Sequence, residues 1–435
     1  MTDTKYSPVI GAEIHIELKT KSKMFCGCVN NPFGADKPNI YTCPVCLGLP
    51  GALPVPNKKA IEDCLLIGLA LNCKIANVSK FDRKHYFYPD LPKGYQISQY
   101  DEPFCQNGYL ETSQGRVGIT RVHMEEDTAK LLHSTLDGKK VTLVDFNRSG
   151  VPLVEIVTEP DIKNAEQAKE LLKKIRDIVR ALGVSDCDME KGSMRLECNI
   201  SLTESSSLPP YKVEVKNINS FRYFANSITY EIARQTEILR AGKLPIQETR
   251  GYRADTNSTV SQRTKEEAAD YRYFPEPDIP PLLFSQAYIE SIRARLPLLP
   301  SDRISSLVTQ GVSQKSAELI AKNESLANLL SEIGAIDASL IAHAANLLVN
   351  KKISSRESAS TIVDTIRRSN SSRISDPSVL GPIVDKVIKD NKQVVFEYQS
   401  GKLGVLGYLM SFVMKETSGQ ADAKIASELL KKKLK

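Results

Sequence analysis

Strict alternation of charged and apolar side chains is the feature that most constrains the fold of this chain. It is clearest in four segments, 9–18, 119–127, 195–201 and 212–217. A period of two puts every charged side chain of such a segment on one face of a strand. Sheets with one wet face are normally antiparallel. The first 280 residues are therefore predicted to contain an antiparallel sheet with one apolar and one charged face.

Helical patterns interrupt these strands. Apolar residues recur every three to four positions over 164–182, where Asn164 is placed to cap a helix and Gly183 to end it. A second helix is predicted over 221–239, and the chain beyond residue 283 is helical in pattern. The sequence thus predicts an α+β fold followed by helices.

Two breaks divide the chain. The run PEPDIPPLL (275–283) contains four prolines and cannot form regular structure, and a second interruption covers 369–382. We expect a first domain over 1–282, an all-α helical domain over 283–370 and a small helical tail domain over 371–435.

Composition and charge narrow the possible partners. The chain has 435 residues, 41% of them hydrophobic, which excludes disorder as the main description. The net charge is +6, and residues 281–435 carry 21 basic and 15 acidic side chains. Either a polyanion binds there or the lysines form a solvated surface. No membrane span or secretory signal is evident, so a cytoplasmic location without membrane contact is expected.

Four of the nine cysteines form a cluster in the sequence. The pairs Cys26-Gly27-Cys28 and Cys43-Pro44-Val45-Cys46 are separated by fourteen residues. Two close thiol pairs flanking a loop are typical of a structural zinc site with four thiolate ligands. The alternatives are four unrelated reduced cysteines or redox chemistry at the second pair. The other five cysteines are expected to be core thiols.

The charged strand faces carry many acids: Glu13, Glu17, Glu125, Asp127, Asp145, Glu155, Glu197 and Glu214. Bases are interleaved with them: Arg83, Lys84, Arg121, Arg148, Arg195, Lys216 and Arg272. Carboxylates suit magnesium and bases suit phosphates, so phosphoryl transfer is one interpretation. The other is a solvated sheet whose charges pair across strands. The sequence contains no P-loop, GxGxxG, HExxH or GxSxG motif, and no glutaminase motif is evident.

Several long segments resemble one family. They are VIGAEIHIEL (9–18), FDRKHYFYPDLPKGYQISQ (81–99), GITRVHMEED (118–127), VDFNRSGVPLVEIVTEPD (144–161), MEKGSMRLECNIS (189–201), EVKNINSF (214–221) and DYRYFPEPDIPPL (270–282). The resemblance is to the GatB family, the B subunits of the aspartyl/glutamyl-tRNA(Asn/Gln) amidotransferases. It covers essentially the whole chain, including a tail that resembles the family's tRNA-binding module.

The resemblance implies a fold and a reaction. The first domain would be a glutamine-synthetase-like antiparallel sheet with a zinc-binding insertion at 26–46. It would use ATP and Mg²⁺ to phosphorylate the side-chain carboxylate of Glu-tRNA(Gln) or Asp-tRNA(Asn), or of both. Ammonia would then displace phosphate. The resemblance also implies a glutaminase partner, GatA, that supplies ammonia from glutamine, and a small third subunit, GatC.

Site residues follow from the family's motifs. The catalytic candidates are Glu13, His15, Glu125, Glu126 and Glu155. Four of these, Glu13, His15, Glu125 and Glu155, are the candidate magnesium ligands, although His15 could instead orient a carboxylate. The phosphate candidates are Lys84, Arg121 and Arg272, which could instead pair with nearby acids. Tyr86, Tyr88 and Tyr95 are candidates for the substrate pocket or for core packing. Cys26, Cys28, Cys43 and Cys46 match zinc-bearing members, and the zinc would be structural.

The tail would bind tRNA through Lys402, Lys415, Lys431, Lys432 and Lys433. Two other functions stay open at this point. A non-catalytic, zinc-bearing tRNA-binding scaffold explains the cysteines and the basic tail but not the acidic faces. A free-standing ligase for small substrates leaves the basic C-terminal third unexplained.

Overall fold

The computed structural model describes residues 5–205, 207–264, 271–371, 374–417 and 419–434. It divides into two compact units, Met1–Pro300 and Ser301–Lys435. The first unit extends beyond the expected boundary at residue 282, because helix α4 (Gln286–Arg293) packs against helix α1 (Lys58–Ala70) through Ile289 and Ile292.

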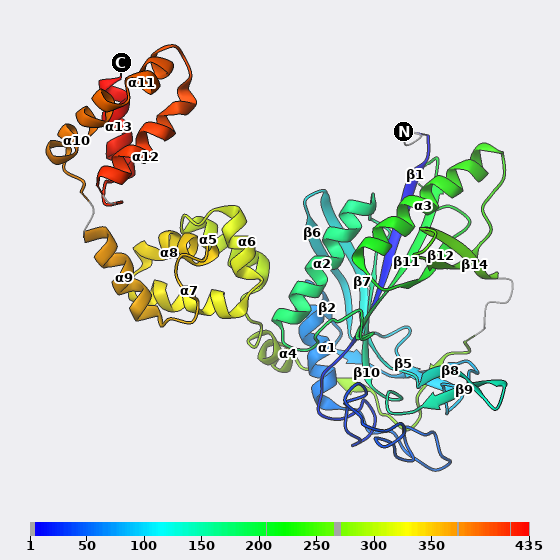
Figure 1. Cartoon of the computed structure of the whole chain (residues 1–435). Helices are drawn as coiled ribbons and strands as arrows, with labels where there is room; N and C mark the ends of the chain where they lie inside the picture. Colours follow the sequence, from blue (N-terminus) through cyan, green and yellow to red (C-terminus); the bar gives the residue numbers. More distant parts are fainter. Residues whose placement is uncertain (1–4, 206, 265–270, 372–373, 418, 435) are drawn as a thin grey trace. The chain divides into compact units, whose positions relative to one another are not determined.

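A nine-stranded sheet forms the centre of the first unit (Figure 1). Its strands, in spatial order, are β14 (Ser258–Thr264), β13 (Glu248–Arg253), β12 (Val213–Ile218), β11 (Met194–Thr203), β1 (Ser7–Glu17), β10 (Pro152–Thr158), β7 (Gly115–Glu126), β6 (Cys105–Thr112) and β2 (Lys74–Ile75). The three longest strands, β7, β1 and β11, each contain most or all of one of the segments in which charged and apolar residues alternate.

Alternation gives this sheet two different faces, as predicted. Ile10, Ile14 and Ile16 of β1 are fully buried in the main hydrophobic core. The core also takes in apolar residues of α1, α2 (Ala165–Ala181) and α3 (Phe221–Arg240), and α2 and α3 lie over the same face in Figure 1. The other face carries the charged residues.

One pair of strands departs from the predicted antiparallel pattern. β12 and β13 are parallel, and α3 connects them. Parallel neighbours need a crossover connection of a dozen or more residues, which this helix supplies. The sheet is therefore mixed, and only this pair breaks the antiparallel order among the described strands.

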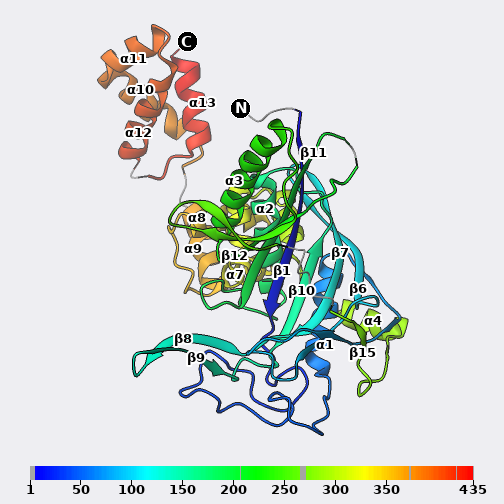
Figure 2. The same ribbon diagram turned by 90° about the vertical axis from the view of Figure 1, so that its right-hand side faces the viewer.

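The smaller strands lie at one end of the first unit. Two small sheets are formed by β15 (Phe274–Pro275), β4 (Asp82–His85) and β5 (Tyr95–Ser98), and by β16 (Leu282–Leu283) and β3 (Val78–Ser79). Strands β8 (Lys130–Leu136) and β9 (Lys139–Asp145) form a separate hairpin (Figure 2). In the chain, this hairpin follows β7 and precedes β10.

The predicted helix limits are confirmed. The Asn164 side chain accepts hydrogen bonds from the backbone N–H groups of Glu166 and Gln167, and α2 ends before Gly183, whose φ is 72°. A positive φ at this place is favourable for glycine, because it has no Cβ.

The second unit is helical and contains two separate hydrophobic cores. One is built by α5 (Pro300–Thr309), α6 (Gln314–Ala321), α7 (Glu324–Ile336), α8 (Ile341–Val349) and α9 (Ala359–Ser371). The other is built by α10 (Pro377–Asp390), α11 (Lys392–Gln399), α12 (Leu406–Glu416) and α13 (Ala423–Lys433). None of the helices described is long and apolar enough to cross a membrane.

Candidate active site on the charged face of the sheet

Strand register brings ionisable side chains of four strands together. His15 of β1 lies opposite Glu155 of β10 on one side and opposite Arg195 of β11 on the other. Glu155 in turn lies opposite His123 of β7. Facing residues on one side of an antiparallel pair have Cβ atoms about 5 Å apart. The register therefore forms a row of ionisable side chains across the centre of the sheet.

A first cluster forms around Glu155. His15, Glu125 and Glu155 each offer a ligand atom, and these atoms lie within 4.8 Å of one another. The Glu155 Oε2 atom is 3.6 Å from His15 Nε2 and 3.3 Å from His123 Nε2. Ser98 Oγ donates to Glu125 Oε1 at 2.9 Å. Three of the four predicted magnesium ligands thus meet at one point.

The electrostatics of this cluster are dominated by burial and by opposite charges. Burial lowers the pKa of His15, but the carboxylates of Glu155, Glu197 and Glu125 together outweigh burial and raise the pKa to about 9. Burial raises the pKa of Glu125, but Lys84 and His123 together outweigh it, and the pKa falls to about 2. The pKa of Glu155 is likewise held well below its usual value by His123 and His15, against the effect of burial. Both carboxyl groups are therefore ionised at neutral pH.

Glu13, the fourth predicted ligand, belongs to a second cluster. Its carboxylate lies with those of Glu197 and Glu214, again within 4.8 Å. Asn199 Nδ2 donates to Glu13 Oε1 at 2.6 Å, and Lys216 Nζ is 3.0 Å from Glu197 Oε2. Burial, followed by Glu155 and Glu197, raises the pKa of Glu13. Within the described part of the chain, Lys216 is the cation paired with these acids, and carboxylates that raise one another's pKa favour a bound metal cation.

Unsatisfied polar atoms mark the same face. Among the described residues, four buried side-chain atoms have no hydrogen-bond partner: Glu17 Oε1, Arg121 Nε, His123 Nδ1 and Asn199 Oδ1. On a strand, side chains an even number of positions apart point to the same face. Glu17 is related in this way to His15 on β1, Arg121 and His123 to Glu125 on β7, and Asn199 to Glu197 on β11. All four therefore lie on the charged face. Buried polar groups are normally satisfied, and exceptions concentrated at one place indicate a missing ligand or ion.

The phosphate candidates are placed differently from one another. Lys84 Nζ is 3.6 Å from Glu125 Oε1, next to the first cluster. Arg121 lies opposite Val157 of β10 on the same face. Arg272 is exposed, with a φ of 45°, and its carbonyl oxygen is 3.1 Å from His85 Nδ1. The structure therefore brings Lys84 to the first cluster and places Arg121 on the face that carries both clusters.

Glu126 points away from both clusters. It is the neighbour of Glu125 on β7, so the pleat directs its side chain to the opposite face. There it is buried, accepts from the backbone N–H of Ile97 at 3.0 Å and pairs with Lys93. A catalytic role for Glu126 remains a prediction without geometric support.

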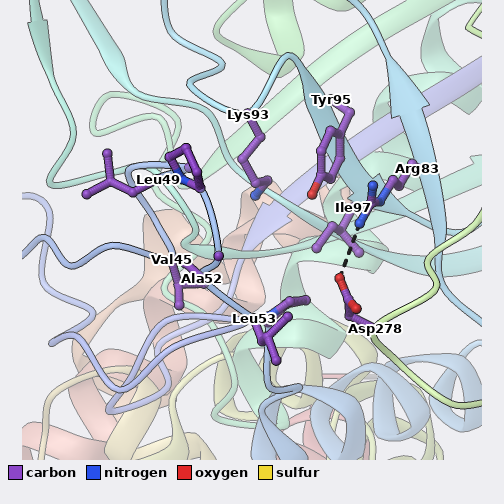
Figure 3. A pocket seen from close by; sticks show the side chains of 13 residues that line it. Val45, Leu49, Ala52, Leu53, Arg83, Lys93, Tyr95, Ile97 and Asp278 are labelled. Carbon is purple, nitrogen blue, oxygen red and sulfur yellow. Dashed lines mark hydrogen bonds and ion pairs between the residues drawn. The ribbon is translucent and has the colours of Figure 1, made fainter.

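A cavity of about 300 Å³ lies outside the clusters (Figure 3). Its walls include Leu49 and Leu53 from the segment after the cysteines, and Arg83, Lys93 and Tyr95 from the β4–β5 region. None of the acids of the two clusters lines it. The clusters, rather than this cavity, therefore define the candidate site.

The three predicted pocket tyrosines do not share one cavity. Tyr95 lines the cavity of Figure 3 beneath the guanidinium of Arg83, which is 4.4 Å from its ring centre. Tyr86 is half-buried against Tyr271, and burial raises its pKa. Tyr88 is 61% exposed and lies in a separate shallow depression. Tyr86 is the one close enough to Lys84 and Glu125 for their charges to act on its hydroxyl group.

The four clustered cysteines converge as the spacing predicts. Their sulfur atoms lie within 4.8 Å of one another, and the other five cysteines are buried. A hydrogen bond from Cys26, together with Lys23 and the Cys43 backbone, lowers the pKa of Cys46 to about 5 although burial opposes this. One thiol of the group is thus already anionic at neutral pH, which favours a metal.

The predicted tRNA-binding lysines lie in the second unit. Lys415, Lys431 and Lys432 are exposed, and the latter two belong to the last turn of α13. Lys402 pairs with Glu397 at 3.3 Å, whereas Lys433 pairs with Asp385 at 2.6 Å and donates to the Gly381 carbonyl. Lys433 therefore links α13 to α10 at the surface, and its role in tRNA binding stays a prediction.

Sequence reasoning left Glu197, Glu214, Asn199 and His123 out of the site. Each lies on an alternating segment and on the polar side of it, so the periodicity already indicated their face. The periodicity does not give the order and register of the strands. These place the four residues beside Glu13 and Glu155.

Comparison with known proteins gives a consistent result over the whole chain. Residues 8–290 match the family model of the GatB/GatE catalytic domain, and residues 303–434 match that of the GatB domain. A protein of Dehalococcoides mccartyi, named as the B subunit of aspartyl/glutamyl-tRNA(Asn/Gln) amidotransferase, is 43% identical over 493 aligned positions, covering 99% of each chain. Proteins of the same name from Carboxydothermus hydrogenoformans and Thermosipho melanesiensis are 42% and 40% identical, with the same coverage.

Proposed function

The chain belongs to the GatB family, and from that premise we propose that it is the subunit of a tRNA-dependent amidotransferase that activates and amidates the aminoacyl group. The substrates would be Glu-tRNA(Gln), Asp-tRNA(Asn) or both, as the names of its relatives indicate. The reaction would be an ATP-dependent carbon–nitrogen ligation with glutamine as the ultimate amide donor.

One observation carries this proposal. Two acidic clusters and four unsatisfied polar atoms share a single face of the sheet. A scaffold that only presents tRNA would not need two groups of carboxylates gathered on one face of the sheet. A phosphoryl-transfer site needs them, because the negative charges of ATP and of the acceptor carboxylate must be brought together.

The residues fit divalent cations. Carboxylate oxygens are the ligands that Mg²⁺ prefers, and both clusters supply them from several strands; His15 offers a nitrogen atom and binds a metal only in its neutral form. His15, Glu125 and Glu155 would hold one ion, and Glu13, Glu197 and Glu214 are candidates for another. A bound Mg²⁺ would neutralise phosphate oxygens and align them for transfer. The glutamine-synthetase-like fold stays a prediction, supported by the carboxylates on one sheet face.

The chemistry assigned to the chain has two steps. The side-chain carboxylate of the aminoacyl group attacks the γ-phosphorus of ATP, ADP leaves and an acyl phosphate forms. Ammonia then attacks the carbonyl carbon, phosphate leaves and the amide remains. Lys84 and Arg121 would lie against the phosphate oxygens, since both are cations on or beside the charged face. Glu126 and Arg272 have no role in this scheme.

Further components follow from the family. We propose that the four cysteines bind a structural zinc ion, because four thiolates leave no open coordination position for substrate. The relatives are named as one subunit of an enzyme, which supports partner chains. We identify these partners as the glutaminase GatA and the small subunit GatC. Exposed tail lysines would contact the tRNA backbone. The cytoplasm remains the predicted location, since tRNA is used in translation there.

The test is an amidation assay on the reconstituted complex. This chain, its two partners, glutamine, ATP and Mg²⁺ are mixed with [14C]Glu-tRNA(Gln) or [14C]Asp-tRNA(Asn), and the released amino acid is identified. Labelled glutamine or asparagine is the expected result. Replacing glutamine by ammonium chloride separates this chain's step from that of the glutaminase.

Two variants make the test specific. Glu125→Gln should abolish amidation while tRNA binding is kept, whereas Glu237→Gln, at an exposed glutamate of α3, should behave as the wild type. A folded complex that binds both tRNAs but yields no amide with either donor would reject the proposal and favour the scaffold.

A further inference from the structure

A fully buried lysine lies beside the four cysteines. Lys23 has 0% of its surface exposed, which is exceptional for a lysine. Its Nζ atom donates to the carbonyl oxygens of Tyr41 at 2.7 Å and of Phe146 at 3.1 Å. These two bonds satisfy part of the donor capacity of the ammonium group but leave its charge uncompensated.

The carboxylate beside Lys23, that of Glu126, has another cationic partner. Among the described residues, none of the acidic side chains forms an ion pair with Lys23, and the nearby Glu126 pairs with Lys93 instead. Burying an ammonium group without a counter-charge costs several kcal/mol, so buried charges are normally paired. Because Glu126 is engaged by Lys93, a further negative group beside Lys23 would complete the charge balance.

The cysteine centre is the other negative group within reach of Lys23. A Cβ added to Gly150 would lie 3.5 Å from Cys46 Cβ, 3.7 Å from Lys23 Cδ and 3.9 Å from Glu126 Oε2, so the lysine stem, Cys46 and Glu126 flank the same point of the backbone. Four thiolates around a divalent zinc ion carry a net charge of −2. A cation held beside such a centre would offset the excess negative charge.

The same lysine joins two parts of the chain. Tyr41 belongs to the loop between the cysteine pairs, whereas Phe146 follows the β8–β9 hairpin and precedes β10. The contact is reinforced by Ser149 Oγ, which donates to the Cys46 carbonyl at 2.8 Å, and by Met24 N–H, which donates to the Gly150 carbonyl at 2.7 Å. The cysteine loop is thus fastened to the segment that leads into the strand of Glu155.

We propose that Lys23 is the buried counter-charge of the four-cysteine metal centre and the link between that centre and the 146–150 segment. This rests on the zinc site proposed above. Lys23 is a positioning residue in this view: it touches no substrate, and it acts on metal retention through its charge and on the segment through two carbonyl groups.

The test measures zinc affinity in the full-length chain. Lys23→Met removes the charge at similar length, and Lys21→Met is the matched control, because Lys21 is exposed two residues away. Loss of a group that supports metal ligands lowers metal affinity by about 10- to 100-fold, measured here by chelator competition with Zn²⁺ alone. We expect a loss of that size for Lys23→Met and none for Lys21→Met. Wild-type affinity in Lys23→Met would overturn the proposal.

A second measurement separates charge from packing. The melting temperatures of the wild type and of Lys23→Met are compared with zinc bound and after chelation. If Lys23 is the counter-charge, the substitution lowers stability much more with zinc than without it, whereas equal losses in both states would show a packing role and overturn the proposal. If Lys23→Met does not fold, Lys23→Gln replaces it, because glutamine keeps a hydrogen-bond donor but not the charge. We expect the same loss of zinc affinity for Lys23→Gln, and wild-type zinc affinity in this variant would overturn the proposal.

The two proposals fail separately. If the wild-type chain binds no zinc, the zinc site itself is wrong. If it binds zinc and the Lys23 variants bind it equally well, only the inference on Lys23 is wrong.

Discussion

Replacing Glu17 by glutamine should stabilise the protein, and more so as the pH rises. Glu17 ends β1 on the charged face and is 5% exposed. Burial, and then the adjacent Asp127, raise its pKa from 4.5 to about 9. Asp127 itself stays ionised, because Arg195 (2.6 Å) and Arg148 outweigh the effect of burial and lower its pKa. The folded chain therefore holds Glu17 in its protonated form at neutral pH.

The sign follows from the two states. Above pH 4.5 the unfolded chain releases the Glu17 proton, whereas the folded chain retains it up to about pH 9. The free energy of unfolding thus falls as the pH rises through this window, by about 1.4 kcal/mol per pH unit. Glutamine cannot ionise and resembles the protonated carboxyl group in shape, so Glu17→Gln removes the loss. Between pH 6 and pH 8 its advantage should grow by about 3 kcal/mol.

Thermal melting of the full chain at pH 6, 7 and 8 measures this. For a unit of this size, about 3 kcal/mol corresponds to a widening of the gap in Tm by roughly 5 °C. Any fixed effect of the new amide on packing cancels, because only the pH dependence of the difference is used. Glu237→Gln, at an exposed position, should give a constant difference. A gap for Glu17→Gln that stays constant or narrows towards pH 8 would refute the reasoning.

Four further changes test other parts of the site. Glu155→Gln removes the carboxylate between two histidines and should reduce Mg²⁺-dependent, aminoacyl-tRNA-dependent phosphate release by about 100-fold or more, with tRNA binding retained. Glu197→Gln should raise the Mg²⁺ concentration needed for half-maximal activity, since it removes one ligand of the second cluster. Cys46→Ser should lower the zinc content from one ion per chain to near zero and destabilise the first unit, as metal analysis and melting would show. Lys431→Ala with Lys432→Ala should weaken tRNA binding and reduce its salt dependence by up to about two counterions, without changing phosphate release at saturating tRNA.

The faces of the sheet could be predicted from the sequence because a strand has a fixed period of two. The same geometry limits what the period can tell. Glu13 and His15 share a face, yet positions two residues apart along a strand are separated by about 7 Å, so they reach different clusters. Which cluster each joins depends on the neighbours, and the register pairs Glu13 with Glu197 and His15 with Glu155. Register is set by contacts between distant segments, which one sequence does not reveal.

Burial of single charges was equally hidden. Lys23 lies in the segment KSKMF, and a lysine in such a segment is normally exposed. Its burial depends on the Phe146 carbonyl, more than a hundred residues away in the chain. The parallel pair β12–β13 is a similar case, because the sequence indicated the strands and the helix α3 but not the direction in which the chain returns.

The charged face can be weighed against the simpler interpretation of a solvated sheet with paired charges. A buried polar atom without a partner costs about 1–3 kcal/mol. Glu17, Arg121, His123 and Asn199 each contribute one such atom within the described part of the chain. Together they cost an amount comparable with the whole free energy of folding of an ordinary domain, about 5–15 kcal/mol. A sheet with only a structural role would have exposed these groups or paired them, as it pairs Arg195 with Asp127. Binding a polyanionic substrate with its cations would supply the missing partners, so the cost argues for a reaction site at this face.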